Sequence, residues 1–351
     1  MTNDVYARLR EFLDNMPGGY PTTESGVEMK ILKKLFTPEQ AEITMKLTGM
    51  PEPVAQIAPR IGMDEAKAAK ALESMAQGGL IVRVRAGDQA MYGAVSYMIG
   101  IYEFHLNKID RELSELMEEY LPHIGEVWKS VKTKQLRVVP VGAALGGDKQ
   151  VATYNQVCEL VKGKQLIAVA PCICTKEQEL VGHKCDRPQE RCILFDMFAQ
   201  FYLDNGMARQ ITQDELAGLL KMGEEQALVF SPTNAKEIMN ICLCCGCCCA
   251  VMRTLQKFER PADQVQSAYQ ARIDPETCVM CGTCEGRCQI KAIKEGDEAY
   301  EVDTARCIGC GVCVPTCPEE AISLVDKPEP ATVPENFLEM QIRLGQERGV
   351  M

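Results

Sequence analysis

The sequence predicts an α+β fold built from three regions that differ in their pattern of apolar residues and cysteines. Residues 28–97 place apolar residues first at helical spacing and then in strand-like alternation. Residues 136–258 mix short apolar runs with helical stretches and carry eleven of the nineteen cysteines, whereas residues 259–327 hold the other eight in two evenly spaced runs. A chain of 351 residues is long enough for such a multidomain organisation.

The first region begins with an arm, predicted over residues 1–27, because the segment 17–21 is rich in proline and glycine. Thr37 and Gln40 then form a capping box for a helix. Helical spacing predicts helices from Glu28 and over Ala41–Thr48, Pro53–Pro59 and Asp64–Gln77, and alternation predicts strands over Leu80–Arg85 and Ala90–Val95. Ile101–Tyr120 is predicted to be a long connecting helix that Pro122 breaks.

Helices followed by a hairpin resemble the winged-helix fold, so residues 28–135 are predicted to be a winged-helix-like domain plus the connecting helix. That resemblance implies DNA binding, but the charges argue against it. Residues 28–100 carry nine basic and eight acidic side chains, and Asp64, Glu65 and Glu73 lie on the helix that would read DNA. Specific DNA binding is therefore not expected, and a docking role is favoured. A redox-sensing winged-helix regulator is kept as an alternative.

Residues 136–258 are predicted to be a central, cysteine-rich domain of mixed α/β structure. Strands are expected over Leu136–Val141 and Leu166–Val169, and helices over Cys192–Asn205 and Gln213–Met222, the last capped by Thr212 with Glu215. The glycine-rich run 142–147 lacks the spacing of a nucleotide-binding loop and is predicted to be a plain loop. Cys158 stands alone and is predicted to be a core residue.

The cysteines of the third region follow the pattern C-x2-C-x2-C-x3-C twice, at Cys278, Cys281, Cys284 and Cys288 and again at Cys307, Cys310, Cys313 and Cys317. This spacing wraps a chain around a [4Fe-4S] cluster. Gly282 and Gly311 help, because glycine adopts left-handed backbone angles at little cost and lets amides approach the cluster sulfurs. Packing or disulfide formation does not explain this double periodicity.

Both runs resemble the two-cluster bacterial ferredoxin domain, in which the fourth cysteine of each run ligates the other cluster. The resemblance implies one cluster on Cys278, Cys281, Cys284 and Cys317 and a second on Cys288, Cys307, Cys310 and Cys313. Pro318 follows the second run as the family pattern requires, but Gln289 replaces the proline after the first. The predicted dicluster ferredoxin domain spans residues 259–327, and residues 328–351 form a Pro-rich linker and a C-terminal helix at Asn336–Gln346.

A second field of cysteines lies upstream, with six thiols among the eight residues 242–249. In steps of three, Cys242, Cys245 and Cys248 repeat the C-x2-C-x2-C pattern, but the next position is Met252. Another thiolate must therefore complete the ligand set. We predict a third metal centre, expected to be iron–sulfur with zinc as the alternative, that draws on Cys242, Cys245, Cys248, Cys172, Cys174, Cys185 and Cys192.

The net charge and its distribution indicate which kind of partner the protein binds. The formal net charge of −11 argues against a protein devoted to nucleic acid. From residue 259 onward, seventeen acids face nine bases, which favours a redox partner with a basic surface. The polar segment 1–10 has no apolar core of a secretory signal, and no stretch has the apolar length of a membrane span, so a cytoplasmic protein is expected.

The central and C-terminal regions together resemble the multidomain ferredoxin-type proteins of anaerobic bacteria. The resemblance implies an electron-transfer protein or subunit that passes low-potential single electrons to redox partner proteins, such as a larger oxidoreductase. The alternative is an oxidoreductase whose active cluster lies in the central domain, so the sequence leaves open whether the chain is itself an enzyme. No Ser/His/Asp triad, P-loop or dinucleotide fingerprint supports a non-redox enzyme.

Overall fold

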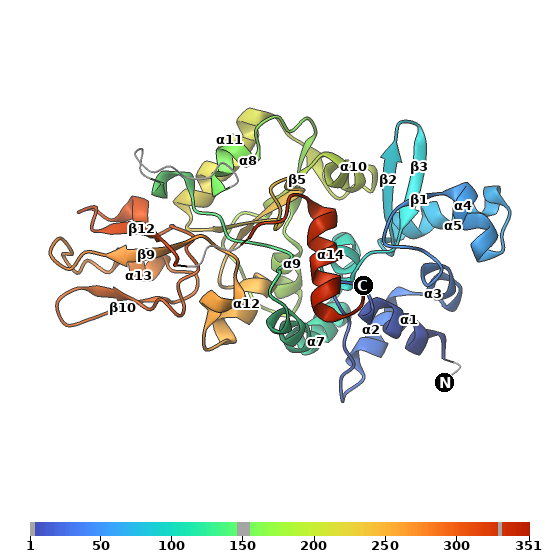
Figure 1. Cartoon of the computed structure of the whole chain (residues 1–351), viewed down its shortest axis with the longest axis horizontal. Coiled ribbons are helices and arrows are strands. Elements are labelled where there is room, and N and C mark those ends of the chain that lie inside the picture. The colour runs from blue at the N-terminus through green and yellow to red at the C-terminus, as the bar shows by residue number, and fades with distance from the viewer. Residues whose placement is uncertain (1–3, 146–154, 329–331) are drawn as a thin grey trace.

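The computed structural model describes residues 4–145, 155–328 and 332–351. The chain runs along one long axis, with the N-terminal helices and hairpin at one end, a five-stranded sheet in the middle and the cysteine-rich β9–β12 segment at the other end (Figure 1). Within these ranges no helix combines the length and apolar character needed to cross a membrane. The architecture is α+β, as predicted.

The N-terminal part combines helices with a small antiparallel sheet of order β1-β3-β2. Its elements are α1 (Val5–Asp14), α2 (Val27–Leu35), α3 (Pro38–Thr44), β1 (Glu52–Pro53), α4 (Val54–Ile61), α5 (Glu65–Gly78), β2 (Val82–Ala86) and β3 (Gln89–Gly93). The predicted capping box is confirmed, since Thr37 accepts from the Gln40 amide and the Gln40 side chain accepts from the Thr37 amide. The Asp64 side chain caps α5 by accepting from the Lys67 amide. The winged-helix resemblance stays a prediction.

Two expectations for this part of the chain were wrong. The predicted arm contains helix α1, because Leu9 and Leu13 are four residues apart and both are fully buried. Pro122 does not break the connecting helix. The chain instead passes through η1 (Tyr97–Ile101) and α6 (Tyr102–Phe104), and then α7 runs from Arg111 to Ser130 with Pro122 inside it. Burial of Leu121 and Ile124 beside the proline offsets the hydrogen bond that it cannot donate.

The central part is built on an antiparallel sheet of order β6-β4-β5-β8-β7. Its elements are η2 (Gly142–Ala144), α8 (Val157–Leu160), β4 (Ile167–Pro171), α9 (Ile173–Leu180), β5 (Glu190–Phe195), α10 (Asp196–Asp204), β6 (Arg209–Gln210), α11 (Gln213–Glu225), β7 (Val229–Pro232), β8 (Asn240–Cys244), α12 (Ala250–Lys257) and η4 (Pro261–Gln264). The predicted strand at Leu166–Val169 and the Thr212–Glu215 capping box are confirmed.

The predicted helix over Cys192–Asn205 is confirmed as α10 over Asp196–Asp204 but is wrong over its first four residues, which belong to β5. Arg191, Ile193 and Phe195 alternate along this strand and are buried, so strand pairing on both sides prevails over the helical pattern. Leu136–Val141 forms only isolated bridges, to Phe230 and Thr233 in and after β7 and to Gln266 before β9, instead of a strand. Gly142–Ala144 forms the short helix η2 within the predicted loop, and residues 146–147 of that loop lie outside the described residues.

The C-terminal part contains two two-stranded antiparallel sheets. Its elements are β9 (Tyr269–Ile273), α13 (Thr283–Arg287), β10 (Ile293–Glu295), β11 (Tyr300–Val302), η5 (Val314–Thr316), β12 (Ile322–Asp326) and α14 (Phe337–Arg348). Strand β12 pairs with β9, and β10 pairs with β11. Helix α14 confirms the predicted C-terminal helix, with Asn336 as its N-cap, and returns to the N-terminal part, where Arg348 donates to the carbonyl oxygen of Asp14 over 2.7 Å (Figure 1).

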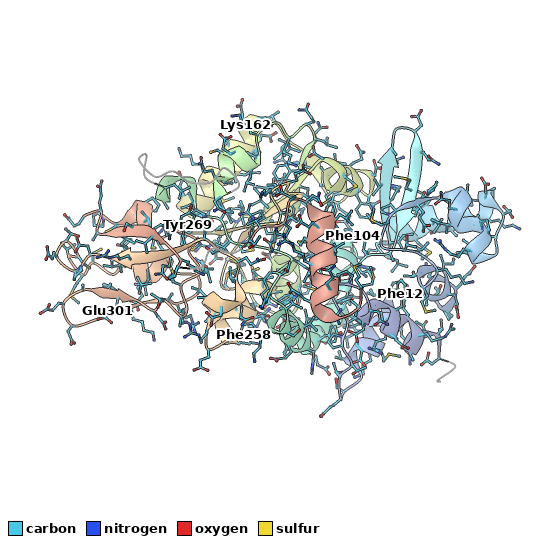
Figure 2. The ribbon with its side chains drawn as sticks, in the orientation of Figure 1. Phe12, Phe104, Lys162, Phe258, Tyr269 and Glu301 are labelled. Atoms are coloured by element: carbon cyan, nitrogen blue, oxygen red, sulfur yellow. The ribbon has the colours of Figure 1, made fainter. Side chains whose placement is uncertain are left out.

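The hairpin of the N-terminal part is joined to the central sheet domain by charge and by aromatic packing. Arg83 is 1 % exposed and pairs with Asp204 at the end of α10, and Arg85 binds the same carboxylate over 2.6 Å. Phe104, labelled in Figure 2, lies in α6 after the hairpin and packs against Phe201 of α10 with ring centroids 4.3 Å apart. The two arginines of the hairpin are therefore used for docking inside the molecule.

Candidate metal centres

The first set of ferredoxin-type cysteines surrounds one small cavity. Cys278 and Cys281 lie in the loop between β9 and α13, Cys284 lies in α13, and Cys317 follows η5. All four line a cavity of about 20 Å³, so Cys317 lies with the three cysteines of the earlier run. Gly282 begins α13 with φ 74°, and a Cβ atom there would lie 3.0 Å from the Tyr300 hydroxyl.

The second set is more deeply buried and receives amide hydrogen bonds. The Ala271 amide donates to the sulfur of Cys307 over 3.3 Å, and the Ala292 amide donates to the sulfur of Cys288 over 3.1 Å. Burial, with the Cys288 and Cys307 thiols nearby, raises the pKa of Cys310 to about 12. Amide donors of this kind stabilise sulfur that binds iron.

These eight cysteines fit two [4Fe-4S] clusters. The first four line a common cavity, and the second four are buried or half-buried, with amide donors on two of their sulfurs. Gly309 allows the second set of cysteines to pack against β9, because a Cβ atom at this position (φ 69°) would lie 2.0 Å from the carbonyl oxygen of Tyr269. Only glycine lets the Cys307–Cys310 loop lie so close to β9.

The central part holds a compact group of four cysteines, which we name the four-thiol group: Cys185, Cys245, Cys247 and Cys248. Cys185 lies between α9 and β5, and the others lie in the loop from β8 to α12. Their sulfurs all lie within 4.8 Å of one another. The sulfur of Cys245 lies 3.0 Å from that of Cys248, 3.2 Å from that of Cys247 and 4.0 Å from that of Cys185.

A buried arginine neutralises this group. Arg191 is 1 % exposed, and its Nη1 and Nη2 atoms lie 3.3 Å from the sulfur of Cys245 and 3.4 Å from that of Cys248. Thr175 lies against Cys248 with its hydroxyl oxygen 3.1 Å from the sulfur. Hydrogen bonds from Cys248 and Arg191 lower the pKa of Cys245 to about 3, so this sulfur is a thiolate at neutral pH. Thiolates are the form that binds metal ions.

The remaining central cysteines, apart from Cys158, form a second group, which we name the six-thiol group: Cys172, Cys174, Cys192, Cys242, Cys244 and Cys249. Cys192 on β5 lies opposite Cys242 on β8 in the antiparallel register. Contact with the Cys192 thiol, together with burial, raises the pKa of Cys242 well above its ordinary value. Asn240 donates from its side-chain amide to the sulfur of Cys242 over 3.5 Å.

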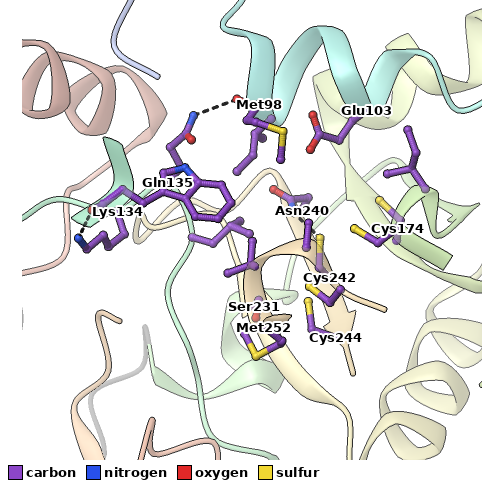
Figure 3. A pocket seen from close by; sticks show the side chains of 18 of the residues that line it. Met98, Glu103, Lys134, Gln135, Cys174, Ser231, Asn240, Cys242, Cys244 and Met252 are labelled. Atoms are coloured by element: carbon purple, nitrogen blue, oxygen red, sulfur yellow. Dashed lines mark hydrogen bonds between the residues drawn. The ribbon is translucent and has the colours of Figure 1, made fainter. Parts of the chain in front are cut away.

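A cavity of about 150 Å³ borders the six-thiol group, and all six cysteines contribute to its lining. Figure 3 shows Cys174 facing Cys242 and Cys244 at one end of this cavity, with Met98 and Glu103 along another wall. The rest of the lining is mainly apolar and includes aromatic side chains such as Trp128, Phe198 and Phe258. Burial raises the pKa of Glu103 to about 7, and the Gly100 amide donates to its carboxylate over 2.8 Å.

The seven cysteines predicted to share a third centre are thus divided between two groups. Cys185, Cys245 and Cys248 gather with Cys247, whereas Cys172, Cys174, Cys192 and Cys242 gather with Cys244 and Cys249. Spacing in steps of three missed the additional members Cys244, Cys247 and Cys249. Their signal was present, since they stand beside predicted ligands in the same run of cysteines. The prediction for Cys158 was wrong, because this residue is exposed.

Residues 271–324 match the family model of the 4Fe-4S dicluster domain, so this part of the chain is a dicluster domain. Comparisons with curated proteins and with solved structures gave no match. The dicluster domain and the central cysteine group together imply iron–sulfur electron transfer.

Proposed function

We propose that this chain is an electron-transfer protein or redox-complex subunit that passes single electrons between its dicluster domain and a metal centre in the central part. When bound, the two [4Fe-4S] clusters supply one-electron redox chemistry at low potential. The chain supplies the thiolates, the amide donors at Cys288 and Cys307, and the burial of Cys307 and Cys313 in the second set.

The observation that carries this proposal is a hydrogen-bonded bridge between the two cysteine regions. The Gly246 amide donates to the side-chain oxygen of Gln289 over 2.7 Å. Gln256 donates to the carbonyl oxygens of both Gly246 and Gln289, over 3.0 and 2.8 Å. Gln289 directly follows Cys288, and Gly246 lies between Cys245 and Cys247. Covalent bonds and one hydrogen bond therefore connect a dicluster ligand with the central cysteines.

The first cysteine set supports a site for exchange with a partner. Cys281 is exposed, and Val279 beside it is 59 % exposed. Two acidic side chains lie near this set. Glu285 accepts a hydrogen bond from the Tyr300 hydroxyl over 3.4 Å, and the negative charge of Glu319 tends to raise the pKa of Cys281. Acidic side chains around a cluster disfavour an added electron, which lowers its potential, and favour a partner with a basic surface. Electrons are thus proposed to enter or leave at this edge.

Anaerobic purification followed by iron and acid-labile sulfide analysis tests the cofactor content. Strong reduction should give the electron paramagnetic resonance signal of two magnetically coupled [4Fe-4S]⁺ centres. Iron without labile sulfide, or zinc alone, would end the proposal.

The bridge itself is tested by Gln289→Ala. One reducing equivalent is mixed with the oxidised full-length protein, and samples are frozen at successive times for spectroscopy. We expect unchanged dicluster signals and slower electron transfer to the central centre, because the hydrogen bond to Gly246 is lost. Gln346→Ala, at an exposed position of α14, is the control. An unchanged rate in Gln289→Ala would show that the bridge is not part of the electron path.

The cavity beside the six-thiol group favours one further function, an oxidoreductase whose reaction centre lies in the central part. Mainly apolar walls with a few polar groups are typical of small-molecule sites. Changes in the cluster spectrum on addition of a substrate would favour this enzyme over a carrier.

A further inference from the structure

The six-thiol group collects side chains from the central sheet and from two helix starts. Cys192 and Cys242 are cross-strand partners, and Cys244 points to the same face as Cys242 because side chains alternate along a strand. Cys172 is the N-cap residue of α9, and Cys174 is the second residue of that helix. Cys249 is the N-cap residue of α12. Strand pairing and helix placement together fix the positions of all six sulfurs.

These cysteines form a series of neighbours around one cavity, because all six contribute to its lining. Cys192 pairs with Cys242 in the sheet register, and Cys172 and Cys174, like Cys242 and Cys244, stand two residues apart in the chain. The series does not meet at a point, since the four-thiol group is the only set of three or more metal-binding side chains in the described ranges whose ligand atoms all lie within 4.8 Å. A polynuclear cluster fits such a series, because each thiolate binds a different metal atom.

The four-thiol group has the opposite geometry. Zinc–sulfur bonds of about 2.3 Å in a tetrahedral site place neighbouring sulfurs about 3.8 Å apart. Cys185 lies 3.7 Å from both Cys247 and Cys248, close to this value, whereas Cys245 lies nearer to its neighbours, 3.0 Å from Cys248 and 3.2 Å from Cys247. The group is thus compact enough to surround one ion. The cysteines of the dicluster domain provide an internal comparison. All eight are described residues, yet no three of their sulfurs all lie within 4.8 Å of one another. These cysteines belong to a 4Fe-4S dicluster domain, so widely spaced sulfurs are compatible with a cubane cluster.

Space and charge at the six-thiol group suit a cluster. Protein interiors are closely packed and hold few voids larger than a water molecule, yet a cavity of about 150 Å³ borders these sulfurs. The N-terminal ends of α9 and α12 carry partial positive charge, and no side chain caps either end. Arg191 also lines this cavity, which adds a full positive charge near the thiolates. Met252 and Leu243 extend the apolar lining that would shield a cluster from water.

We infer that the six-thiol group binds a polynuclear iron–sulfur cluster at the wall of the cavity, separate from a single tetrahedral ion held by the four-thiol group. This inference deepens the proposed function, on which it rests for the central redox centre. It also extends the electron path, because Cys245 and Cys244 immediately precede Gly246 in the chain. The bridge from Gln289 therefore leads by covalent bonds to a member of each central group.

The test uses the full chain, reconstituted anaerobically with ferrous iron and sulfide. Two [4Fe-4S] clusters account for about eight irons and about eight sulfides per chain. We expect labile sulfide clearly above this level. The double variant Cys242→Ser, Cys249→Ser should return sulfide to about eight while keeping the dicluster resonance signals. Cys247→Ser should lose the single ion and keep the excess sulfide, and Cys158→Ser, at an exposed cysteine outside both groups, should match the wild type.

The outcomes separate this inference from the proposed function. Sulfide of about eight in the wild type, or excess sulfide that survives in the double variant, would overturn the six-thiol cluster and leave the dicluster domain intact. Loss of the excess sulfide in Cys247→Ser alone would instead assign the cluster to the four-thiol group and also overturn the inference. A wild type that takes up no labile sulfide would contradict the proposed function itself. Because the wild-type sulfide content decides by itself, misfolding of the double variant does not block the test.

Discussion

The Nη1 atom of Arg191 donates a hydrogen bond to the sulfur of Cys245 over 3.3 Å, in a part of the protein where the arginine is 1 % exposed. A buried guanidinium is costly unless anionic partners surround it, so Arg191 and the thiolates of the four-thiol group depend on each other. The pairing has a direct consequence for metal binding.

Replacing Arg191 by Met should weaken metal binding at the four-thiol group. Without the guanidinium, the pKa of Cys245 rises, and the thiolates lose a hydrogen-bond donor. Loss of such outer contacts typically lowers metal affinity by about 10- to 100-fold. Competition with a chelator under anaerobic conditions measures the change. Arg209→Met, at an exposed ion pair on the same sheet, is the control, and equal affinity in both variants would contradict the role of Arg191.

Exchange of ligands between the two dicluster runs gives a second prediction. Cys317→Ser should damage the cluster held by Cys278, Cys281 and Cys284, because Cys317 shares their cavity. Cys313→Ser should damage the other cluster. Resonance spectra of reduced protein should show which signal each variant loses, and loss of the same signal in both would refute the crossed arrangement.

Glu103 gives a third prediction, on stability as a function of pH. Burial raises its folded-state pKa to about 7, above the ordinary value of about 4.3. Between these values the native protein binds more protons than the unfolded chain, so stability falls as pH rises and levels off above about 7. From pH 5 to pH 8 the wild type should lose about 2 to 3 kcal/mol more than Glu103→Gln, at about 1.36 kcal/mol per pKa unit.

Anaerobic denaturant unfolding of both proteins at the two pH values measures this difference. Charges elsewhere titrate alike in the two proteins, so only the Glu103 contribution separates them. Parallel curves would place the Glu103 carboxyl in water and contradict its burial.

A fourth prediction concerns nucleic acid. The N-terminal hairpin should not bind duplex DNA specifically, because Arg83 and Arg85 are engaged with Asp204 on α10. Arg60 is likewise paired with Glu52. Retardation of duplex DNA in gels at physiological salt should require concentrations above about 1 μM, the range of non-specific binding. Sequence-dependent binding at nanomolar concentration would restore the regulator alternative.

Features that depend on residues close together in the chain were predictable from the sequence, whereas contacts between residues far apart in the chain were not. The Thr37 and Thr212 capping boxes depend on contacts three residues apart, and both formed as predicted. The dicluster cysteines follow a local loop pattern and match a known family. The division of the central cysteines depends on the pairing of Cys192 with Cys242, fifty residues apart in the chain, and no spacing rule contains that register.

The same run of cysteines illustrates the limit. Steps of three place Cys242 with Cys245, but β8 continues through Cys244, so the chain is extended there and carries Cys242 away from the loop. A spacing rule that assumes a compact loop therefore fails where a strand enters the motif. The prediction that Pro122 breaks the helix failed for a related reason, because the burial of Leu121 and Ile124 on α7 depends on tertiary packing that the sequence does not show.

The contact between Gln289 and Gly246 also bears on the order in which the protein matures. The loop that carries Cys245, Cys247 and Cys248 owes part of its shape to a side chain of the dicluster domain. A proline at position 289, as in the family pattern, would offer no side-chain oxygen to the Gly246 amide. Folding of the dicluster domain should therefore favour the loop geometry in which these cysteines receive metal, so cluster assembly in the dicluster domain should promote metal uptake by the four-thiol group.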